Sequence, residues 1–356
     1  MNIGISIILF LLAQFPFPGP NSPYSHAATS YKRSITIDHT KCGSANSTDF
    51  PLYVYISDAT FKTVANGGHV QNSSGSDVLF YTDSGLGTQI ASELESYDAA
   101  NGVVRAWVKV ATLSSSADTV IYVSYGVASP PARTSGAWNS NFKGVWHLGD
   151  GSTVGTSDSS GNSNTLTNSS GAAVSGKIYG AVSFNGSSQY MYISSPGASL
   201  KPATVSVSAW IQWAGDSGTD TAVGIGNGSA DSNRAYAFYH SGSTIYGEIN
   251  SFGQYASTST VGLGGNWAHI VMTANPSGNV IIYKNGSATT GSSGTTISYT
   301  SVDTFTIGRA PSATRYMNGY IDEVHVVGAE LTQSWVTSEY NNQNSPSTFF
   351  TLGAES

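Results

Sequence analysis

Two carboxylates on one strand-like segment are the first candidates for chemistry. Glu93 and Glu95 are two residues apart within residues 90–97, so a strand points both side chains to the same side. A retaining glycosidase places two carboxyl groups about 5 Å apart, on either side of the bond that it breaks. One pair at this spacing is weak evidence for such a site, and we favour a solvated strand face.

A second acidic pair and three histidines lie within apolar strand-like segments. Asp322 and Glu323 are adjacent, so a regular strand points them to opposite faces, one of which is the core. We therefore do not expect two cooperating carboxyl groups there. Metal binding or base catalysis is open to His147, His269 and His325, but we expect partly buried, hydrogen-bonded strand residues.

Two common catalytic motifs are absent from the sequence. The chain has no Gly-x-Ser-x-Gly elbow for a nucleophilic serine and no Cys-x-x-Cys pair for zinc. Cys42 is the only cysteine, so an intramolecular disulfide cannot form. We expect Cys42 to be a small side chain at a strand end rather than a nucleophile.

Residue types suited to sugar binding are concentrated in residues 213–258. Aromatic faces can stack on pyranose rings, while amides and charged groups can bond hydroxyl groups in a shallow cleft. The ligand-binding candidates are Trp213, Arg234, Tyr239, Tyr246 and Asn250. Aromatic residues that alternate along strands also form core contacts or cross-strand pairs, so both interpretations stay open.

Composition narrows the class of protein and its partners. Charged residues make up only 10% of the 356 residues, and 40 residues are glycine. Uncharged polar side chains take the place of Lys and Glu, which is typical of an exported β-protein with many tight turns. The net charge is -7 without a basic cluster, so we expect no nucleic-acid partner.

Residues 1–27 have features of a signal peptide. Ile3–Ala13 is an apolar run shorter than the ~20 residues that cross a bilayer, and Ser25 and Ala27 are small residues before a cleavage site. We predict cleavage after Ala27 and secretion to the extracellular space or cell surface, with no membrane span left afterwards.

The strand pattern predicts an all-β protein with two domains. Residues 28–128 contain six strand-like segments separated by turn residues, which predict a β-sandwich. Residues 129–143 include Ser129-Pro-Pro131 and predict a short, stiff linker. Residues 144–356 contain about a dozen more strand-like segments, which predict two stacked antiparallel sheets in a jelly roll.

The clearest local prediction is a hairpin at residues 267–286. Trp267–Thr273 and Val280–Tyr283 are rich in β-branched and aromatic residues, and a Pro-Ser-Gly-Asn turn joins them. Asn285-Gly286 then predicts a second tight turn. A single hairpin buries too little surface to be stable alone, so it requires a partner sheet.

The first domain resembles a domain of unknown function that occurs in exported microbial and viral surface proteins, often ahead of a laminin-G-like domain. The resemblance covers nearly all of residues 30–128 and implies no activity. It depends on the segments Tyr31–Asp38, Thr48–Leu52, Ser76–Phe80, Glu93–Tyr97, Ala106–Val110 and Ile121–Gly126.

The second domain resembles the laminin-G-like, concanavalin A-like lectin and glucanase group over about residues 144–327. The resemblance implies a curved jelly roll, a fold used by sugar binders, adhesion modules and some glycosidases. Its ordered motifs are Val145–Leu148, Asp158–Asn162, Gly176–Gly186, Val207–Ile211, Trp267–Val271, Ile282–Gly286, Ile307–Arg309 and Asn318–Val324.

The same resemblance bears on metal binding and catalysis. Members of the group often bind a structural calcium ion, for which Asp158 and Asp322 are the best oxygen donors in this sequence. Asp158 in its turn could equally bond its own backbone. The laminarinase-like glycosidases carry Glu-x-Asp-x-x-Glu on one strand, and this sequence lacks that pattern.

These observations support three hypotheses about function. The first is an exported, non-catalytic binding or adhesion protein whose jelly roll recognises glycan or another cell-surface polymer. The second is a structural subunit of a surface layer, fibre or virion, which would contact other protein subunits. The third is a glycoside hydrolase whose carboxylates the motifs do not reveal, with Glu248 or Glu323 as candidates.

The C-terminal segment predicts one helix. Leu331–Tyr340 can begin at a Thr332 cap, and Val336 and Tyr340 are one turn apart. We expect the helix to bury Trp335 and Tyr340 on the sandwich and to end before Pro346. Phe349–Leu352 predicts a final strand.

Overall fold

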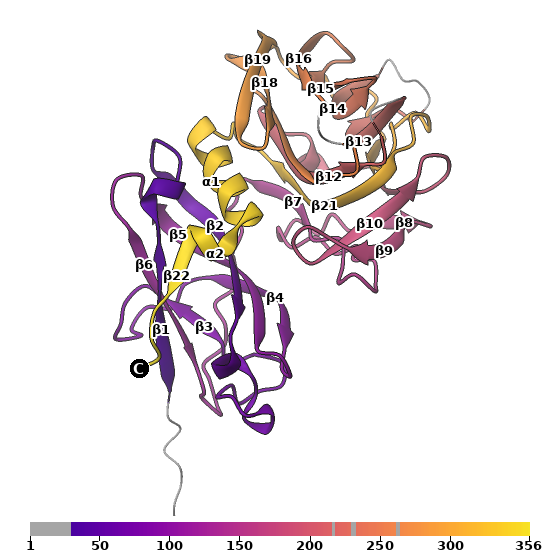
Figure 1. The fold of residues 1–356 in the computed structure, drawn as a ribbon. Helices are drawn as coiled ribbons and strands as arrows, with labels where there is room; N and C mark the ends of the chain where they lie inside the picture. Colours follow the sequence, from indigo (N-terminus) through magenta and orange to yellow (C-terminus); the bar gives the residue numbers. More distant parts are fainter. Residues whose placement is uncertain (1–29, 216–217, 229–232, 261–263) are drawn as a thin grey trace, which may run out of the picture.

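The computed structural model describes residues 30–215, 218–228, 233–260 and 264–356. These residues form two β-sandwiches with a short helical segment between them (Figure 1). The predicted all-β fold class, with an N-terminal β-sandwich and a second sandwich of two antiparallel sheets, is confirmed. The predicted signal peptide lies outside the described residues.

The N-terminal sandwich pairs a four-stranded sheet with a three-stranded one. The four-stranded sheet has the order β22-β1-β6-β3 and the three-stranded sheet the order β2-β5-β4. The strands are β1 (Tyr31–Ile37), β2 (Ser47–Ser57), β3 (Leu79–Tyr81), β4 (Ser92–Asp98), β5 (Val103–Leu113), β6 (Thr119–Tyr125) and β22 (Phe350–Leu352).

The C-terminal sandwich stacks an eight-stranded sheet on a seven-stranded one. The eight-stranded sheet consists of β7 (Phe142–Trp146), β9 (Ala172–Ser175), β10 (Gly180–Asn185), β12 (Val205–Trp213), β17 (Ala268–Ala274), β18 (Asn279–Lys284), β19 (Ser287–Ser293) and β21 (Asn318–Val327). The seven-stranded sheet consists of β8 (Thr167–Ser169), β11 (Tyr190–Ser194), β13 (Thr219–Gly226), β14 (Arg234–Ser241), β15 (Thr244–Ile249), β16 (Gln254–Ser259) and β20 (Thr304–Ile307).

The predicted hairpin lies in the eight-stranded sheet. Strands β17 and β18 pair antiparallel, and β18 continues through Asn285-Gly286 into β19. Both turn residues have positive φ, 51° and 81°, as a two-residue hairpin turn of this kind requires. The hairpin is confirmed, and the partner sheet that it needs is the seven-stranded one, whose Phe238 and Ile249 share its apolar core.

A third apolar cluster joins the two sandwiches. Tyr53 and Trp107 of the N-terminal sandwich pack with Val145, Trp210 and Tyr283 of the eight-stranded sheet. The three-stranded sheet therefore faces the outer side of the eight-stranded sheet. The seven-stranded sheet lies on the far side of the molecule (Figure 1).

Helix α1 (Gln333–Asn344) bridges the two sandwiches with a polar face. Thr332 caps it by accepting a hydrogen bond from the backbone N–H of Trp335, as predicted. Its buried residues are mostly polar. We expected the helix to bury Trp335 and Tyr340, but both residues stay partly exposed. The buried residues are Ser334, Val336, Ser338, Glu339, Asn342 and Gln343.

The polar face of α1 bonds to both sandwiches. Ser338 accepts a hydrogen bond from the Gly43 N–H at 2.9 Å, and Gln343 accepts one from the Trp210 indole at 2.6 Å. A side chain at Gly43 would lie 2.2 Å from the Ser334 backbone, so only glycine allows this approach. Buried polar groups are tolerated here because they are hydrogen-bonded.

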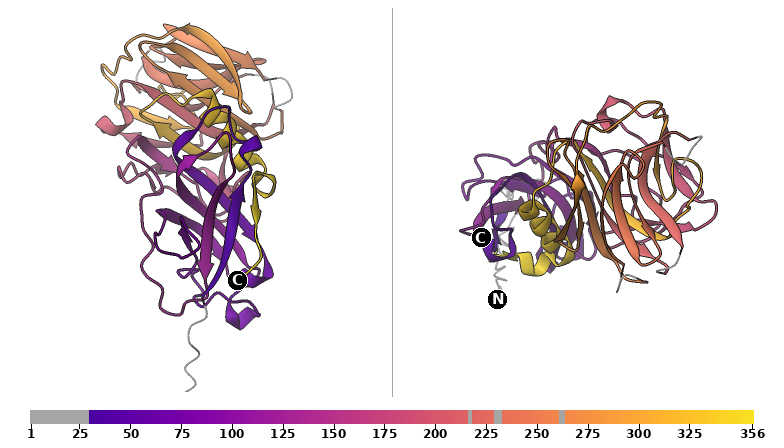
Figure 2. Two further views of the ribbon diagram at one scale, coloured as in Figure 1. Left: turned by 90° about the vertical axis from the view of Figure 1, so that its left-hand side faces the viewer. Right: turned by 90° about the horizontal axis from the view of Figure 1, so that it is seen from above.

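The end of the chain departs from the domain assignment that we predicted. We assigned residues 144–356 to one jelly-roll domain, but β22 pairs antiparallel with β1 of the N-terminal sandwich. Figure 2 shows this yellow segment running beside the indigo strands. Strand β22 pairs with the edge of β1 that faces away from β6, and the apolar Phe350 belongs to the core of this sandwich.

Sequence periodicity missed several short or irregular strands. The missed strands are β8, β9, β13, β16 and β19, which contain many Ser, Thr and Gly residues and little apolar alternation. A search of the described residues for a long apolar helix of membrane-spanning length found none.

Substitution of Asn342 tests how strongly α1 is bound to strand β2. Its side-chain amide bonds both backbone groups of Tyr53 on edge strand β2, accepting at 2.7 Å and donating at 3.0 Å. We expect Asn342→Ala to lower the free energy of unfolding by about 2–4 kcal/mol, because two buried backbone groups lose partners. Urea unfolding measures this.

The matched control is Asn341→Ala. Asn341 makes a single bond at an exposed position, to the Lys41 carbonyl at 2.8 Å. Its loss should cost about 1 kcal/mol or less. Equal losses for the two variants would contradict the role given to Asn342.

Candidate functional site

Three of the five predicted ligand-binding residues meet on the outer face of the seven-stranded sheet. Tyr239 of β14 lies directly opposite Tyr246 of β15, and their rings stack with centroids 5.4 Å apart. Inward-facing neighbours Tyr236 and Phe238 fill the core. Arg234 begins the same strand and carries its guanidinium 5.8 Å from the Tyr239 ring centroid.

The aromatic patch consists of Tyr246, Phe252 and Tyr255, above the buried Tyr239. Phe252 is 47% exposed and Tyr255 is 43% exposed, whereas Tyr239 is only 1% exposed. Phe252 stands edge-on to Tyr239 at 5.7 Å, and Tyr255 lies 5.9 Å from Tyr246. The patch therefore presents aromatic surface to solvent on a sheet face.

Phe252 reaches the patch from a loop in a restricted backbone conformation. Asn250, Ser251 and Phe252 have φ values of 53°, 53° and 69°. Non-glycine residues seldom adopt this left-handed region, and such departures are concentrated at functional sites. The amide of Asn250 holds the loop by donating to the Thr296 carbonyl at 3.0 Å and accepting from the Ser298 N–H at 2.8 Å.

A polar pocket of about 260 Å³ adjoins this loop. Its lining contains hydroxyl, amide and guanidinium groups and no apolar residue. The lining residues are Asn233, Arg234, Asn250, Ser251, Ser298, Thr300 and Ser301. Two predicted residues, Arg234 and Asn250, are therefore part of a surface pocket beside the aromatic patch.

An ion pair is buried under the patch. The Arg234 Nε bonds a Glu248 oxygen, and the two side chains are 2% and 0% exposed. Burial raises the pKa of Glu248, although its bond to Arg234 acts in the opposite direction. A buried ion pair contributes little net stability, so its function here is to fix Arg234 and Tyr239 in place.

Trp213 is not part of the aromatic patch. It ends β12 in the other sheet, is 1% exposed, and packs edge-on against His240 at 5.0 Å within the core. Strand alternation in the sequence could not separate this core indole from an exposed one.

The two predicted calcium ligands are engaged by backbone groups. Asp158 accepts hydrogen bonds from the N–H groups of Val145, Ser160 and Asn164 at 2.8–3.0 Å, which fixes its loop. Asp322 is fully buried and accepts one from the Ile178 N–H at 2.8 Å. Among the described residues, neither aspartate belongs to a cluster of three or more side chains that could hold a metal ion. Calcium binding therefore stays a prediction.

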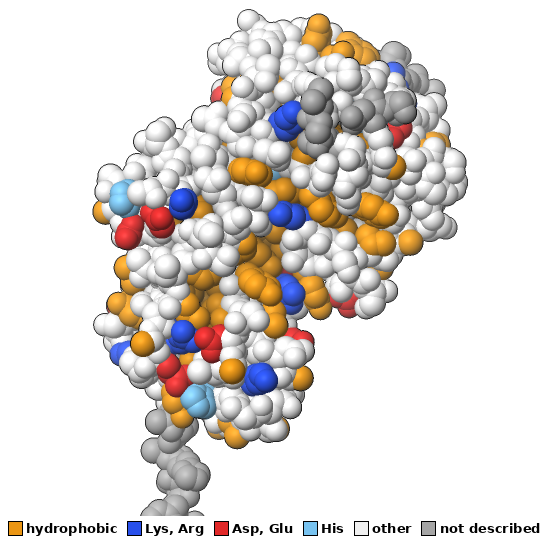
Figure 3. Space-filling model, viewed as in Figure 1, with side chains coloured by type: hydrophobic (Ala, Val, Ile, Leu, Met, Phe, Trp, Pro, Cys, Tyr) orange, Lys and Arg blue, Asp and Glu red, His pale blue; other side chains and the backbone are white. Residues whose placement is uncertain are grey.

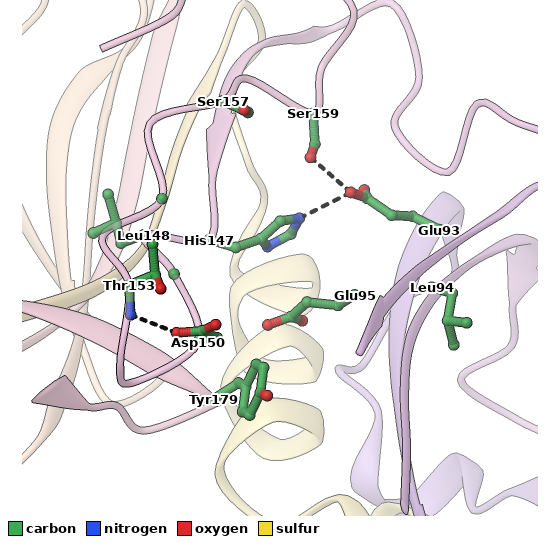
Figure 4. A pocket seen from close by; sticks show the side chains of 12 residues that line it. Glu93, Leu94, Glu95, His147, Leu148, Asp150, Thr153, Ser157, Ser159 and Tyr179 are labelled. Atoms are coloured by element: carbon green, nitrogen blue, oxygen red, sulfur yellow. Dashed lines mark hydrogen bonds and ion pairs between the residues drawn. The ribbon is translucent and has the colours of Figure 1, made fainter. Parts of the chain in front are cut away.

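A second site lies where the two sandwiches meet. The junction cleft, with a volume of about 340 Å³, is lined by Glu93 and Glu95 from β4 and by residues of the C-terminal sandwich from His147 to Tyr179. Figure 4 shows the two carboxylates reaching in from one side and the His147 imidazole from the other. The predicted solvated strand face was wrong, because β4 faces the other sandwich.

Glu323 lies behind His147 because strand β21 is bulged. The pairing of β21 with β12 shifts register between Ser208 and Trp210, and Glu323 has a φ of 49°. A bulge breaks the strict alternation of a strand. Our expectation that Asp322 and Glu323 face opposite sides was therefore wrong, since the flanking Ile321 and Val324 both belong to the core between the two sheets and neither acidic residue does.

In the junction cleft, His147 lies between carboxylates that bond its ring and raise its pKa. The Glu323 carboxylate bonds His147 Nδ1 at 2.8 and 3.0 Å, while His147 Nε2 lies 3.4 Å from Glu93. Burial opposes protonation of His147, but the negative charges of Glu323 and Glu95 outweigh it and raise its pKa well above the ordinary value.

The pKa values of the two carboxylates of β4 are shifted in opposite directions. Burial raises the pKa of Glu95 to about 7, and one of its oxygens accepts from the Trp107 indole at 2.8 Å. Burial also opposes ionisation of Glu93, but its ion pair with His147 and the hydrogen bonds from Trp138 and Ser159 outweigh this and lower its pKa to about 2.

A buried chain of polar groups extends from the junction cleft to α1. His325 bonds Glu323 at 3.1 Å through Nε2, and its Nδ1 lies 3.3 Å from the Ser208 hydroxyl and 3.4 Å from Glu339. His269 lies 3.8 Å from the same Glu339 oxygen. His269 and His325 are thus buried strand residues and His147 is a half-buried residue at a strand end, and each has a carboxylate partner.

Comparisons with known proteins agree with the architecture of the C-terminal sandwich. Residues 184–337 match the family model described as the concanavalin A-like lectin/glucanases superfamily, which is less than half of the chain. A domain of this superfamily is therefore present in the second sandwich. The first sandwich's resemblance to a domain of unknown function stays a prediction. No curated protein matches the chain.

Solved structures with similar arrangements include toxin binding domains. The binding domain of botulinum neurotoxin DC in complex with SialylT has a TM-score of 0.44 at 15% identity, covering 57% of this chain and 52% of that chain. The binding domain of Paraclostridial mosquitocidal protein 1 has a TM-score of 0.43 at 17% identity, covering 56% and 52%. This chain matches about half the length of those chains.

Glu339 predicts how acid affects the docking of α1. Burial raises its pKa, but interactions with His269 and His325 outweigh this and lower the pKa to about 2. A depressed carboxyl pKa stabilises the fold above the ordinary value of 4.5, and this contribution is lost as the pH falls toward 2. Between pH 6 and pH 3 the wild type should lose on the order of 2 kcal/mol more stability than Glu339→Gln.

Urea unfolding at several pH values measures the difference between the two proteins. Glu330→Gln, at an exposed carboxylate that accepts from Asn275, is the control and should follow the wild type. Parallel pH profiles for wild type and Glu339→Gln would show that Glu339 is not ionised in the folded protein.

Proposed function

We propose that this chain is an exported, non-catalytic binding or adhesion protein whose jelly roll recognises a glycan or another cell-surface polymer. The observation that carries the proposal is the aromatic patch of Tyr246, Phe252 and Tyr255 beside a pocket of purely polar side chains. Membership of the C-terminal sandwich in a lectin and glucanase superfamily is consistent with it.

The two halves of this surface supply the two contacts that a sugar needs. The apolar faces of pyranose rings can stack on exposed aromatic rings, as other apolar ligands do. Sugar hydroxyl groups both donate and accept, which suits the Ser, Thr, Asn and Arg groups of the pocket. The underlying Arg234–Glu248 pair keeps the guanidinium fixed, which reduces the entropy lost on binding.

The weak surface charge also favours a neutral ligand. Figure 3 shows few charged side chains on the face that it draws, and most atoms there belong to uncharged polar or apolar groups. Long-range electrostatic steering of a charged polymer requires a concentrated charge of one sign. We therefore favour neutral glycan over an anionic or cationic polymer.

Buried carboxylates support a non-catalytic role. Glu248 and Glu323 are the candidate residues of the glycosidase alternative, and their side chains are 0% and 1% exposed. Glu323 also directs both oxygens to His147. A glycosidase acid or nucleophile must reach the glycosidic bond, and these two groups are enclosed.

Glycan-array binding followed by titration tests the proposed function. We expect binding to at least one neutral glycan, and Phe252→Ala and Tyr255→Ala should each weaken it by about 10-fold, equivalent to about 1.4 kcal/mol. Tyr320→Ala is the matched control, since Tyr320 is 37% exposed but belongs to β21 of the other sheet. Silence across a broad array, or equal binding by all variants, would contradict the proposal.

A further inference from the structure

The junction cleft contains a set of metal-ligating atoms that the proposed function does not use. We propose that Glu93, Glu95 and His147 bind a divalent transition-metal ion of the zinc type, with Glu323 orienting the histidine. The ion would join β4 of the N-terminal sandwich to the segment after β7 of the C-terminal sandwich.

The distances fit such an ion. A ring nitrogen of His147 and carboxylate oxygens of Glu95 and Glu323 all lie within 4.8 Å of one another, and His147 Nε2 is 3.4 Å from Glu93 Oε1. Around a tetrahedral zinc ion with bonds of about 2.0–2.2 Å, neighbouring ligand atoms lie roughly 3.3–3.6 Å apart. The separation of His147 Nε2 and Glu93 Oε1 is therefore already that of neighbouring zinc ligands, and Glu95 belongs to the same cluster of side chains.

Two atoms that face the cluster lack hydrogen-bond partners. His147 Nε2 and Glu95 Oε1 are both buried with almost no exposed surface and make no hydrogen bond, since the contact of His147 Nε2 with Glu93 Oε1 is an ion pair at 3.4 Å. A buried polar atom without a hydrogen bond destabilises the fold, so its presence requires an explanation. A metal ion held by both atoms would satisfy them together.

The surrounding groups fix the proposed ligands from behind. Glu323 bonds His147 Nδ1, which leaves Nε2 directed toward Glu93 and Glu95. A carboxylate behind a ligating histidine is the usual support of a metal site. Trp138 and Trp107 donate to the second oxygens of Glu93 and Glu95 in the same manner.

The ligand types select the class of metal. Imidazole suits zinc and its first-row neighbours, whereas calcium and magnesium prefer oxygen ligands alone. Three protein ligands beside a cleft of about 340 Å³ leave room for water at a fourth position. This site shares no residue with Asp158 and Asp322, the predicted calcium ligands.

Calorimetric titration of the chelator-treated full chain with zinc chloride tests the proposal. We expect one ion at the junction, a rise in melting temperature with zinc, and at least 10-fold weaker binding for Glu95→Gln and His147→Gln. Glu323→Gln should weaken binding 10- to 100-fold, as loss of a supporting carboxylate usually does.

A surface cluster must be separated from the junction in this experiment. Asp38, His39 and Asp118 also bring possible ligand atoms within 4.8 Å of one another, at more exposed positions. All proteins are therefore compared in a His39→Ala background. No zinc binding in that background, or unchanged binding by Glu95→Gln and His147→Gln, would overturn the proposal.

X-ray absorption of the zinc-loaded His39→Ala protein gives a readout that does not depend on whether the junction variants fold. One imidazole nitrogen with carboxylate and water oxygens at about 2.0–2.2 Å supports the junction site. A shell of water oxygens alone, or of two or more imidazoles, contradicts it.

Discussion

The bond between the Glu323 carboxylate and the His147 imidazole, both in the C-terminal sandwich, fixes the ring that meets Glu93 of the other sandwich at 3.4 Å. Strand β21 pairs with β10 over Asn318–Ile321 and with β7 over Val324–Val327, and Glu323 lies between these two partners. The left-handed backbone at Glu323 turns its carboxylate toward the neighbouring sandwich. Because the group is buried, a charge there requires a charged or strongly donating partner, and His147 and His325 supply it.

Around this pair the two sandwiches are joined by apolar and polar contacts together. Trp107, Trp138 and Trp210 provide apolar area, and two of these indoles also donate to carboxylates of β4. Helix α1 then bonds both sandwiches through a polar face, and β22 returns the chain to β1. Polar contacts across an interface require precise geometry, so they favour one relative orientation where apolar packing alone would permit several.

Much of the fold could be predicted from the sequence because local patterns determine it. Residue types predicted six strands in residues 28–128, as observed, and Asn285-Gly286 predicted the turn between β18 and β19. The junction could not be predicted, because alternation assumes a regular strand. Bulges at Glu95 in β4 and Glu323 in β21 interrupt that regularity, and the one in β21 places Glu323 beside His147. The sequence contains no short-range pattern that indicates either bulge.

The candidate sugar site, too, could be predicted only in part from the sequence. Residue type correctly grouped Arg234, Tyr239 and Tyr246, because strand pairing brings them together. It did not identify Phe252, because a loop of residues in the left-handed conformation positions that ring. The patch and the junction cleft lie on opposite sides of one apolar core, since β14 and β15 belong to the sheet that faces away from the N-terminal sandwich. Close-packed cores deform little, so a change at the junction alters how the sandwiches are held together and leaves the patch intact. The jelly roll can thus present its outer face to a ligand while its other face serves only to fix it to the rest of the chain.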